Sequence, residues 1–371
     1  MYHSEKHAPK SGMPILYHQR ATNKFAEGIK EEGYFWILKR LLETKVVDEI
    51  LLIIESTAGQ GCIHYMPNFT GWVFPDIYQF NEYLRHDDII WCRGGHRSNH
   101  DFLVEASKKG HWVMLYAANT GRQKWKLWDV VLTDFGVANH IDIRGRFWFY
   151  WKKPINPEIF RFTNQERIYD ICIGASNIHD KKGQWRVIDA LVKHKKMYHK
   201  NLNCILPGGF YHGALSNDIA DKIREHGLHV KLTGLVPRPV LAQILNQSKL
   251  FINGGSYGEN DRGPLEAMRC GCFVMITTPG RHSPVTHSNP DVSYIFKKKA
   301  DMSDSFCFGE MALEIEQCLK RWNEDVPKKV IDYYESVSGI ETVVLPEMAK
   351  LIKLMRNNEP GDPNTFHELL K

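Results

Sequence analysis

The chain has 371 residues, which is long for a single hydrophobic core, so we expect two domains. With 43% hydrophobic and 25% charged residues, its composition is that of a globular, soluble protein. It has no apolar run near the roughly 18 residues that a membrane-spanning helix needs, and its polar N-terminus predicts no signal peptide. The net charge of +5 suits an anionic ligand but falls short of the strongly basic composition of a dedicated nucleic-acid binder.

The eight cysteines are scattered along the chain. Cys270 and Cys272 are spaced C-x-C without a second cysteine pair or a histidine cluster, so the pattern does not predict a zinc site. Buried, reduced thiols are expected instead, and they indicate a reducing compartment. We therefore expect a cytoplasmic protein.

The beginning of the chain predicts a β-α-β unit. A strand is expected at Met13–His18 and a helix at about Ile29–Thr44, where apolar residues recur near helical spacing. The run Glu49–Ile54 is continuously apolar, as is typical of a strand buried in a parallel sheet.

Three further strands are expected in the first half, at Asp88–Cys92, Trp112–Asn119 and Asp129–Phe135. A Gly-Gly turn follows the first of them and leads through His96 toward a helix. His96 and Asn119 thus stand at the carboxyl ends of two strands. Because parallel sheets bind ligands at that edge, both residues are candidates for the reacting centre.

The segment Phe147–Phe160 closes the first half of the chain. Pro154 and Pro157 stiffen it and prevent a helix, as expected of a linker between domains. We place the domain boundary near Phe160.

The second half alternates predicted strands and helices, which indicates a second α/β layer structure. The strands are expected at Tyr169–Ser176, Asn203–Gly209, His229–Gly234, Leu250–Asn253, Cys272–Thr277 and Val292–Phe296. The helices are expected at Asn217–His226, Val240–Gln247, Gly309–Trp322 and Lys328–Met355, and a further one opens at Pro264.

The most informative segment is Lys249–Thr278, KLFINGGSYGENDRGPLEAMRCGCFVMITT, which combines a buried strand, a Gly-rich turn, a helix and a second strand. Pro264 suits a first helical turn because its missing N–H would be unpaired there anyway. Gly271 stands where a helix C-terminus favours a left-handed residue. The turn and the helix N-terminus therefore lie at the carboxyl edge of a parallel sheet, where such sheets bind nucleotides and phosphates.

This segment resembles the donor-binding signature of the GT-B glycosyltransferases, closest to glycosyltransferase family 4. The run from Pro264 to Gly271 is similar to the family's "LEAMACG", with Glu266 as its glutamate. Where the family places its first acidic residue, this chain has Gly258, and Glu259 follows it, so either Glu259 or Asp261 takes that role. The resemblance implies an α/β fold of GT-B type, with two facing Rossmann-like domains, an interdomain cleft and a C-terminal helix that crosses back.

The resemblance also implies how the donor is held. Glu266 would accept hydrogen bonds from the ribose hydroxyls of a nucleotide-sugar, because an ionised carboxylate is an acceptor only. Lys182 and Arg262 would face the diphosphate. Lys182 stands before Gly183 like the family's lysine, whereas the family's arginine is missing, since Ala175 and Ser176 follow the strand's glycine.

The remaining implied contacts involve the base, the sugar and the reacting centre. Backbone groups of Gly234, Leu235 and Val236 would hold the base. Gly263, Pro264 and Leu265 would complete the donor-binding turn. Glu259, or the backbone of Gly258, would contact the donor sugar, and His96 or Asn119 would lie near the reacting centre, with Asn119 where many relatives carry a histidine.

The sequence therefore predicts a hexosyl- or pentosyltransferase that moves a sugar from a nucleotide-sugar, such as a GDP- or UDP-sugar, to a glycan, lipid or other hydroxyl acceptor. No D-x-D motif is present, so metal independence is expected, with positive charge and helix dipoles stabilising the leaving diphosphate. The donor is a substrate, and no further cofactor is expected. The resemblance implies a retaining reaction. The expected domains are an acceptor domain at 1–160, a donor domain at 161–335, and a helix and tail at 336–371 that pack back toward the acceptor domain.

Alternative functions stay open at this point. A DNA-modifying glycosyltransferase of phage type would use the basic and aromatic run Arg122–Trp128 and the pair Lys152–Lys153 on phosphates and bases. The missing arginine, shifted acid and missing histidine also fit a catalytically degenerate nucleotide-sugar-binding module. A nucleotide-sugar 2-epimerase would need more carboxylate and histidine groups. A dehydrogenase is not favoured, since no G-x-G-x-x-G stands at a strand-to-helix turn.

Overall fold

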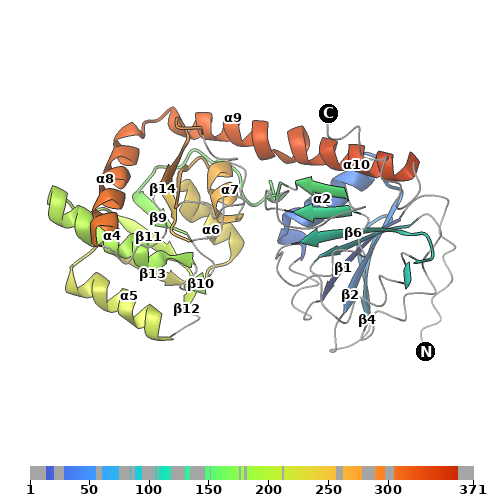
Figure 1. Cartoon of the computed structure of the whole chain (residues 1–371), viewed down its shortest axis with the longest axis horizontal. Helices are drawn as coiled ribbons and strands as arrows, with labels where there is room; N and C mark the ends of the chain where they lie inside the picture. The colour runs from blue at the N-terminus through green and yellow to red at the C-terminus, as the bar shows by residue number, and fades with distance from the viewer. Residues whose placement is uncertain are drawn as a thin grey trace. The chain divides into compact units, whose positions relative to one another are not determined.

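The computed structural model describes residues 14–20, 29–55, 61–74, 84, 88–93, 105–106, 108–117, 130–133, 147–150, 152–174, 177–178, 182–210, 213–255, 262–277, 289–296 and 305–357. The chain divides into two units, each treated separately below (Figure 1). Unit 1 comprises residues 1–134, 138–151 and 344–371, and unit 2 comprises 135–137 and 152–343. The predicted domain limits, 1–160, 161–335 and 336–371, stay predictions.

Unit 1 contains a sheet in which neighbouring strands are parallel except for one antiparallel pair, β3 and β4. In their order across the sheet the strands are β3 (Gly61–Met66), β4 (Phe69–Phe74), β2 (Glu49–Glu55), β1 (Pro14–Arg20), β5 (Ile89–Arg93), β6 (Trp112–Ala117), β7 (Val130–Thr133) and β8 (Phe147–Tyr150). Strands β2, β3 and β4 lie on one side of β1, and strands β5 to β8 lie on its other side. This reversal defines a topological switch point between β1 and β5.

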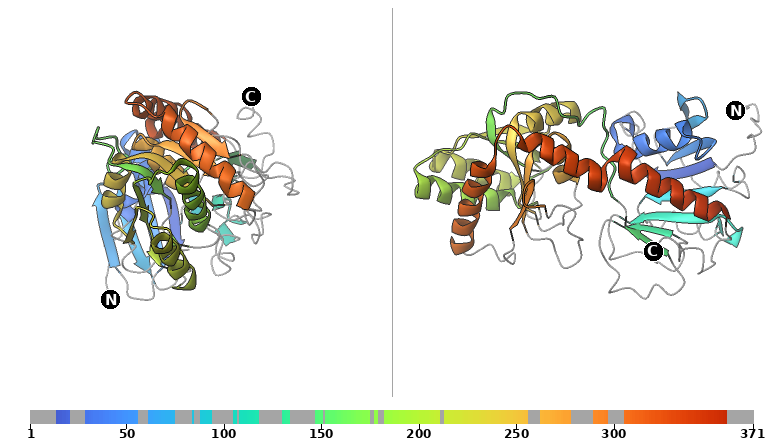
Figure 2. Two further views of the ribbon diagram at one scale, coloured as in Figure 1. Left: turned by 90° about the vertical axis from the view of Figure 1, so that its left-hand side faces the viewer. Right: turned by 90° about the horizontal axis from the view of Figure 1, so that it is seen from above.

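Helices α2 (Gly33–Glu43) and α10 (Leu345–Asn357) pack against each other in unit 1 (Figures 1 and 2). The buried residues of α10 recur at helical spacing and are Leu345, Met348, Leu351, Ile352 and Met355. The helix expected at Ile29–Thr44 is divided: a 3₁₀ turn, η1 (Ile29–Glu31), precedes α2, which begins at Gly33. The last helix that the structure describes is thus part of the first unit.

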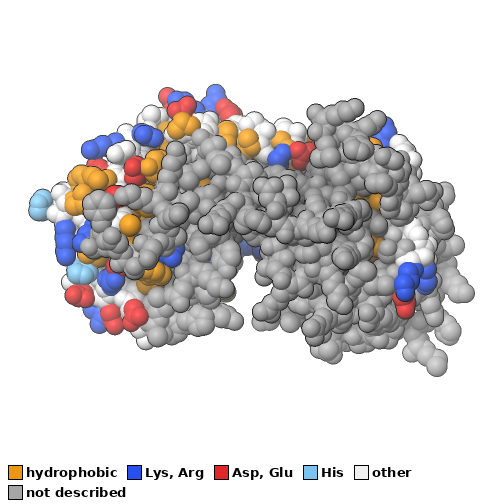
Figure 3. Space-filling view, in the orientation of Figure 1, with side chains coloured by type: hydrophobic (Ala, Val, Ile, Leu, Met, Phe, Trp, Pro, Cys, Tyr) orange, Lys and Arg blue, Asp and Glu red, His pale blue; other side chains and the backbone are white. Residues whose placement is uncertain are grey.

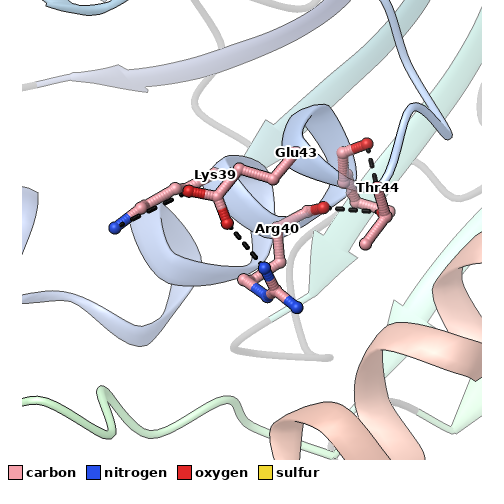
Figure 4. A network of polar contacts seen from close by, with 5 residues as sticks. Lys39, Arg40, Glu43 and Thr44 are labelled. Atoms are coloured by element: carbon pink, nitrogen blue, oxygen red, sulfur yellow. Dashed lines mark hydrogen bonds and ion pairs between the residues drawn. The ribbon is translucent and has the colours of Figure 1, made fainter.

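The exposed end of α2 is held by a small polar network (Figure 4). Glu43 accepts from Arg40 Nη1 at 2.6 Å and lies 3.8 Å from Lys39 Nζ, and the Thr44 hydroxyl donates to the carbonyl of Arg40 at 2.7 Å. Each such surface pair stabilises a helix by about 0.2–0.5 kcal/mol. The network therefore fixes the end of the helix without adding much to the stability of the unit.

The hairpin β3–β4 was not predicted. Its turn carries Asn68 in a left-handed conformation, at φ 62°, and an aromatic cluster of Phe35, Tyr65 and Phe69 covers one face. Gly71 leaves room for that cluster, because a Cβ there would lie 2.8 Å from Cε2 of Tyr65. The hairpin extends the sheet beyond β2.

Unit 2 contains a second sheet, and all its neighbouring strands are parallel. Across the sheet the strands are β13 (Val230–Gly234), β11 (Cys204–Pro207), β9 (Tyr169–Ile173), β14 (Ser248–Asn253), β15 (Phe273–Thr277) and β16 (Ser293–Phe296). Two short strands, β10 (Asn177–Ile178) and β12 (Gly209–Phe210), form a separate parallel pair. In chain order the six strands run 3-2-1-4-5-6, the doubly wound order of dinucleotide-binding domains. The switch point lies between β9 and β14.

The helices of unit 2 are α4 (Gln184–Tyr198), α5 (Gly213–Glu225), α6 (Arg238–Asn246), α7 (Arg262–Arg269), α8 (Ser305–Arg321) and α9 (Val326–Ser338). In Figure 1, α4 packs with α8 and α6 packs with α7. The central strands are buried on both faces of the sheet: the register partners Ile171 and Leu250 lie in the core on one face, and the register partners Cys172 and Phe251 lie in the core on the other.

The prediction of one helix at Lys328–Met355 is wrong. Helix α9 ends at Ser338, Gly339 is extended at φ −59° and ψ 138°, and a π-helical segment, η5 (Ile340–Val344), precedes α10. A Cβ on Gly339 would lie 2.3 Å from both the Glu335 carboxylate and the Thr342 hydroxyl. Continuous helical propensity along this segment hid the break, because Gly is tolerated within a helical pattern at modest cost.

A hydrogen bond between a histidine and a carboxylate joins helices α4 and α8. His194, 1% exposed, lies 2.9 Å from Oε2 of Glu316, which is 13% exposed. Burial raises the pKa of Glu316, but the hydrogen bond to His194 and the charges of Lys200 and Lys320 outweigh it and leave the pKa below its ordinary value of 4.5. A depressed carboxyl pKa stabilises the folded state above pH 4.5, and this stabilisation is lost as pH falls through the native pKa.

Glu316→Gln is therefore expected to make the free energy of unfolding depend less on pH in the acid range. Urea unfolding should show that the wild type loses free energy of unfolding, relative to the variant, as the pH falls from 4.5 through the lower native pKa of Glu316. Glu225→Gln, an exposed change in the same unit, is the control and should follow the wild type. Parallel wild-type and Glu316→Gln curves below pH 4.5 would contradict the assignment.

Arg167 ties together the amino-terminal edge of the unit 2 sheet. Its Nη1 donates to the carbonyls of Leu245 at 2.8 Å and Ser248 at 2.6 Å, and its Nη2 donates to that of Cys270 at 2.8 Å. One guanidinium thus joins the ends of α6 and α7 to the start of β14. A planar guanidinium suits this task because its donors are fixed in a fork.

Arg167→Met is expected to lower the free energy of unfolding by about 2–4 kcal/mol, since three carbonyls lose their charged donor. Chemical denaturation followed by fluorescence measures this. Arg161→Met, on an exposed side chain nearby, should cost less than about 0.5 kcal/mol. Equal losses in the two variants would show that the guanidinium contributes nothing to stability beyond its surface packing.

Among the residues that the structure describes, no helix has both the length and the apolar character needed to cross a membrane.

Candidate functional site

The site candidate lies at the switch point of unit 2, where β9 and β14 end side by side. The ladder between them continues past β9, since the N–H of Gly174 donates to the carbonyl of Ile252 at 2.8 Å. At the end of β14, Asn253 Oδ1 accepts from the N–H of Gly255 at 3.2 Å and shapes the turn. Ligands of open α/β sheets bind outside this point.

Two glycines cross at this point with no space for a side chain on either. A Cβ on Gly183 would lie 1.8 Å from the carbonyl oxygen of Gly254, and a Cβ on Gly254 would lie 2.3 Å from that of Gly183. Gly183 also has φ +66°, which only glycine adopts readily. The loop before α4 is therefore in backbone contact with the loop before α7.

Two helices begin beside this crossing. Gly183 is the N-cap of α4 and supplies no side-chain oxygen to the first N–H groups, and α7 begins at Arg262. The prediction placed the start of α7 two residues later, at Pro264. Helix N-termini carry a partial positive charge, so both helices favour an anion at this edge.

Cationic side chains flank the two helix starts. Lys182 and Arg262 are both partly buried. Arg186, in the first turn of α4, donates from Nη1 to the carbonyl of Gly254 at 3.3 Å, and its guanidinium lies 5.2 Å from the ring of Trp185. Arg186 thereby joins α4 to the β14 turn. Together these groups suit a diphosphate.

Glu266 is buried on the inner face of α7, at 8% exposed. In the described part of the chain, Asp88 is the other carboxylate that is buried to this degree. Burial is the largest cause of the raised pKa of the fully buried Tyr334 and Cys270; Glu335 raises the pKa of Tyr334 and Cys272 raises that of Cys270, and Glu266 adds a smaller increase to both. When ionised, the carboxylate of Glu266 is a hydrogen-bond acceptor in the first turns of α7.

The other predicted donor residues lie on the same edge or outside the described residues. Gly263, Pro264 and Leu265 form the first turns of α7 with Arg262 and Glu266. Gly234, at φ +71°, ends the edge strand β13, and Leu235, which is 72% exposed, and Val236 follow it. The structure thus brings the predicted diphosphate and ribose residues together around β9 and β14, with the predicted base segment at β13.

His96, Asn119, Gly258 and Glu259 lie outside the described residues, as does the run Arg122–Trp128. Their roles stay predictions.

Gly174, Asn253 and Gly254 were missed as site residues. The Gly-Gly pair after β14 and the glycine after β9 are visible in the sequence, but their contact joins segments that are distant along the chain. In the sequence, Asn253 is only a polar residue at the end of an apolar run, and this pattern alone does not identify a site residue.

The described residues also show how charged side chains are distributed and whether clusters of side chains could bind a metal ion. In Figure 3, acidic and basic side chains are interspersed over the visible described surface of unit 2. Within the described residues, no cluster of three or more His, Cys, Asp or Glu side chains could hold a metal ion.

No protein-family model matches the sequence, and no curated protein matches it either. The fold does resemble solved structures. A glycosyltransferase from Rickettsia africae ESF-5 matches with a TM-score of 0.67 and 14% identity, over 93% of this chain and 98% of that one. Sucrose-phosphate synthase from Thermosynechococcus elongatus matches with a TM-score of 0.63 and 11% identity, over 92% and 98%. Anabaena HepE, in complex with UDP and glucose, matches with a TM-score of 0.62 and 12% identity, over 92% and 99%.

The chain therefore has the α/β fold of the GT-B glycosyltransferases, as its Lys249–Thr278 segment predicted. At these identities the likeness establishes the fold, and the assignment to family 4 stays a prediction.

Proposed function

We propose that the chain is a glycosyltransferase that moves a hexosyl or pentosyl group from a nucleotide-sugar to a hydroxyl acceptor such as a glycan or lipid. One observation carries the proposal: the Gly183–Gly254 crossing at the switch point stands beside two helix N-termini and the buried carboxylate of Glu266. Anabaena HepE, which has a similar fold, is described in complex with UDP-glucose. A uridine donor is therefore the first to test.

In this proposal each part of the nucleotide-sugar is bound by a protein group of complementary chemistry. Lys182 and Arg262 pair with the diphosphate, and the carboxylate of Glu266 accepts from the ribose hydroxyls. Backbone groups of Gly234, Leu235 and Val236 hold the base. Gly258 or Glu259 contacts the sugar, and His96 or Asn119 stands near the reacting centre.

In the reaction, these groups would stabilise the nucleoside diphosphate as it leaves the sugar. As the bond between the anomeric carbon and the β-phosphate oxygen breaks, negative charge grows on the diphosphate. The helix N-termini and cations of unit 2 stabilise that charge without rearrangement. We propose that the reaction needs no metal ion and retains the anomeric configuration, and that it takes place in the cytoplasm.

The proposal is tested by donor turnover. The full chain is incubated with UDP-, GDP- and ADP-sugars, and the released nucleoside diphosphate is measured with and without a hydroxyl acceptor. A glycosyltransferase should release one nucleotide slowly to water, faster with acceptor, and equally in the presence of a chelator. Binding without release from any donor, with every acceptor tried, would instead identify a degenerate binding module.

The DNA-modifying alternative is decided by a gel-shift titration. A DNA acceptor requires complexes with duplex DNA that weaken steeply as salt increases, because counterions are released from the phosphates. No shift at low salt would leave a glycan, lipid or other small acceptor.

Lys182→Ala is expected to weaken binding of UDP about tenfold to thirtyfold, since a charged hydrogen bond contributes about 1.5–3 kcal/mol, reduced here by partial exposure. Lys196→Ala, at the exposed far end of α4, is the matched control and should bind UDP like the wild type. Titration calorimetry measures both. An unchanged Kd in Lys182→Ala would remove Lys182 from the diphosphate site.

A further inference from the structure

Phe251 lies beneath the site, on the central strand β14, and is 4% exposed. Its register partners are Cys172 on β9 and Val274 on β15. Because side chains alternate along a strand, Gly174 follows Cys172 on the face of the sheet that Phe251 occupies. A Cβ on Gly174 would lie 2.4 Å from Cζ of Phe251 and 2.9 Å from Cε2.

The same ring tip also meets the first turn of α7. A Cβ on Gly263 would lie 3.1 Å from Cζ of Phe251 and 3.7 Å from Cε1. One atom of one ring therefore limits how closely two backbone segments approach, the end of β9 and the start of α7. Both segments carry glycine where they touch it.

We propose that Phe251 is a positioning residue of the donor site: its ring holds the end of β9 and the first turn of α7 at the separation that a diphosphate requires. The effect on diphosphate binding rests on the proposed function, whereas the role of Phe251 in separating the end of β9 from the start of α7 does not. The ring touches no ligand and acts through Gly174 and Gly263. A phenyl ring suits this role because it is rigid beyond χ2, whereas an aliphatic side chain is shorter or more flexible.

A double-mutant cycle between Phe251→Leu and Gly263→Ala tests the spacing. Gly263→Ala adds a methyl group against the ring tip, and Phe251→Leu removes that tip. Each single change should raise the Kd for UDP about threefold to tenfold, and the double variant should bind at least fivefold more tightly than the product of the single effects predicts. Gly263→Ala is chosen over a change at Gly174 because its contact is milder. If Phe251→Leu does not fold, Phe251→Met takes its place.

A matched cycle uses Phe273→Leu, the same change on the fully buried Phe273 of β15, with Gly263→Ala. This pair should be additive. Equal coupling in both cycles would show a general loosening of the sheet and overturn the role of Phe251.

Hydrogen exchange provides a readout that does not depend on nucleotide binding. In Gly263→Ala, the amides of residues 266–269, which bond to carbonyls in the first turn of α7, should exchange faster than in the wild type; adding Phe251→Leu should restore their protection while residues 305–321 of α8 stay unchanged. Additive exchange effects would overturn the proposal, as would coupling seen only in Tm. If the wild type binds no nucleoside diphosphate, the proposed function fails, and the exchange cycle still decides whether Phe251 sets the spacing.

Discussion

Gly183→Ala is expected to cost at least about 3 kcal/mol of stability and to abolish nucleotide binding. Two effects combine at this position. Alanine at φ +66° pays the left-handed penalty of about 1–2 kcal/mol, and its Cβ would lie 1.8 Å from the carbonyl oxygen of Gly254. Because backbone, unlike a flexible side-chain end, cannot move aside locally, the two loops must separate.

Gly227→Ala separates the two effects. Gly227 has φ +54°, but a Cβ there would meet only the flexible end of Lys195, at 3.3 Å. That variant should lose about 1–2 kcal/mol and keep its affinity for nucleotide. Urea unfolding and calorimetry measure both variants. Equal losses of stability in Gly183→Ala and Gly227→Ala would mean that the crossing is not tight.

Glu266→Gln is expected to weaken donor binding about tenfold to a hundredfold. Glutamine keeps the size of the side chain but removes the charge. The charge-assisted hydrogen bonds from the two ribose hydroxyls, each about 1.5–3 kcal/mol, become neutral ones that are roughly half as strong. The variant keeps an acceptor oxygen, so the fold is retained. Calorimetry with UDP and with the matching 2′-deoxynucleotide measures the effect.

The deoxynucleotide makes the Glu266 test specific. The wild type should prefer the ribonucleotide, and Glu266→Gln should lose much of that preference. Glu225→Gln, exposed on α5, should change neither affinity. A variant that binds both nucleotides as the wild type does would show that Glu266 is a buried structural carboxylate.

The sequence predicted best those elements whose pattern is local. A continuous apolar run located β2, and Pro264 and Gly271 marked the two ends of the helix that the structure shows as α7. The GT-B fold followed from the Lys249–Thr278 segment, which is a local signature, and the structural comparisons bear it out.

Features that depend on tertiary contacts were not predicted. The hairpin β3–β4 has a mixed pattern of exposed and half-buried residues along β3, so it lacks the alternation that marks a half-buried strand. The break at Gly339 depends on side chains that crowd it, Glu335 and Thr342. The Gly183–Gly254 crossing and the contact of Phe251 with two glycines join segments that no periodicity relates.

The most direct test of the donor site is a thermal-shift screen of the wild type and Glu266→Gln with GDP-, UDP- and ADP-sugars. A ligand that binds only the folded state raises Tm, by an amount that follows from its concentration relative to Kd. We expect one nucleotide series to raise the Tm of the wild type and to raise that of Glu266→Gln much less. No rise with any donor, or an equal rise in both proteins, would contradict a nucleotide-sugar site built around Glu266.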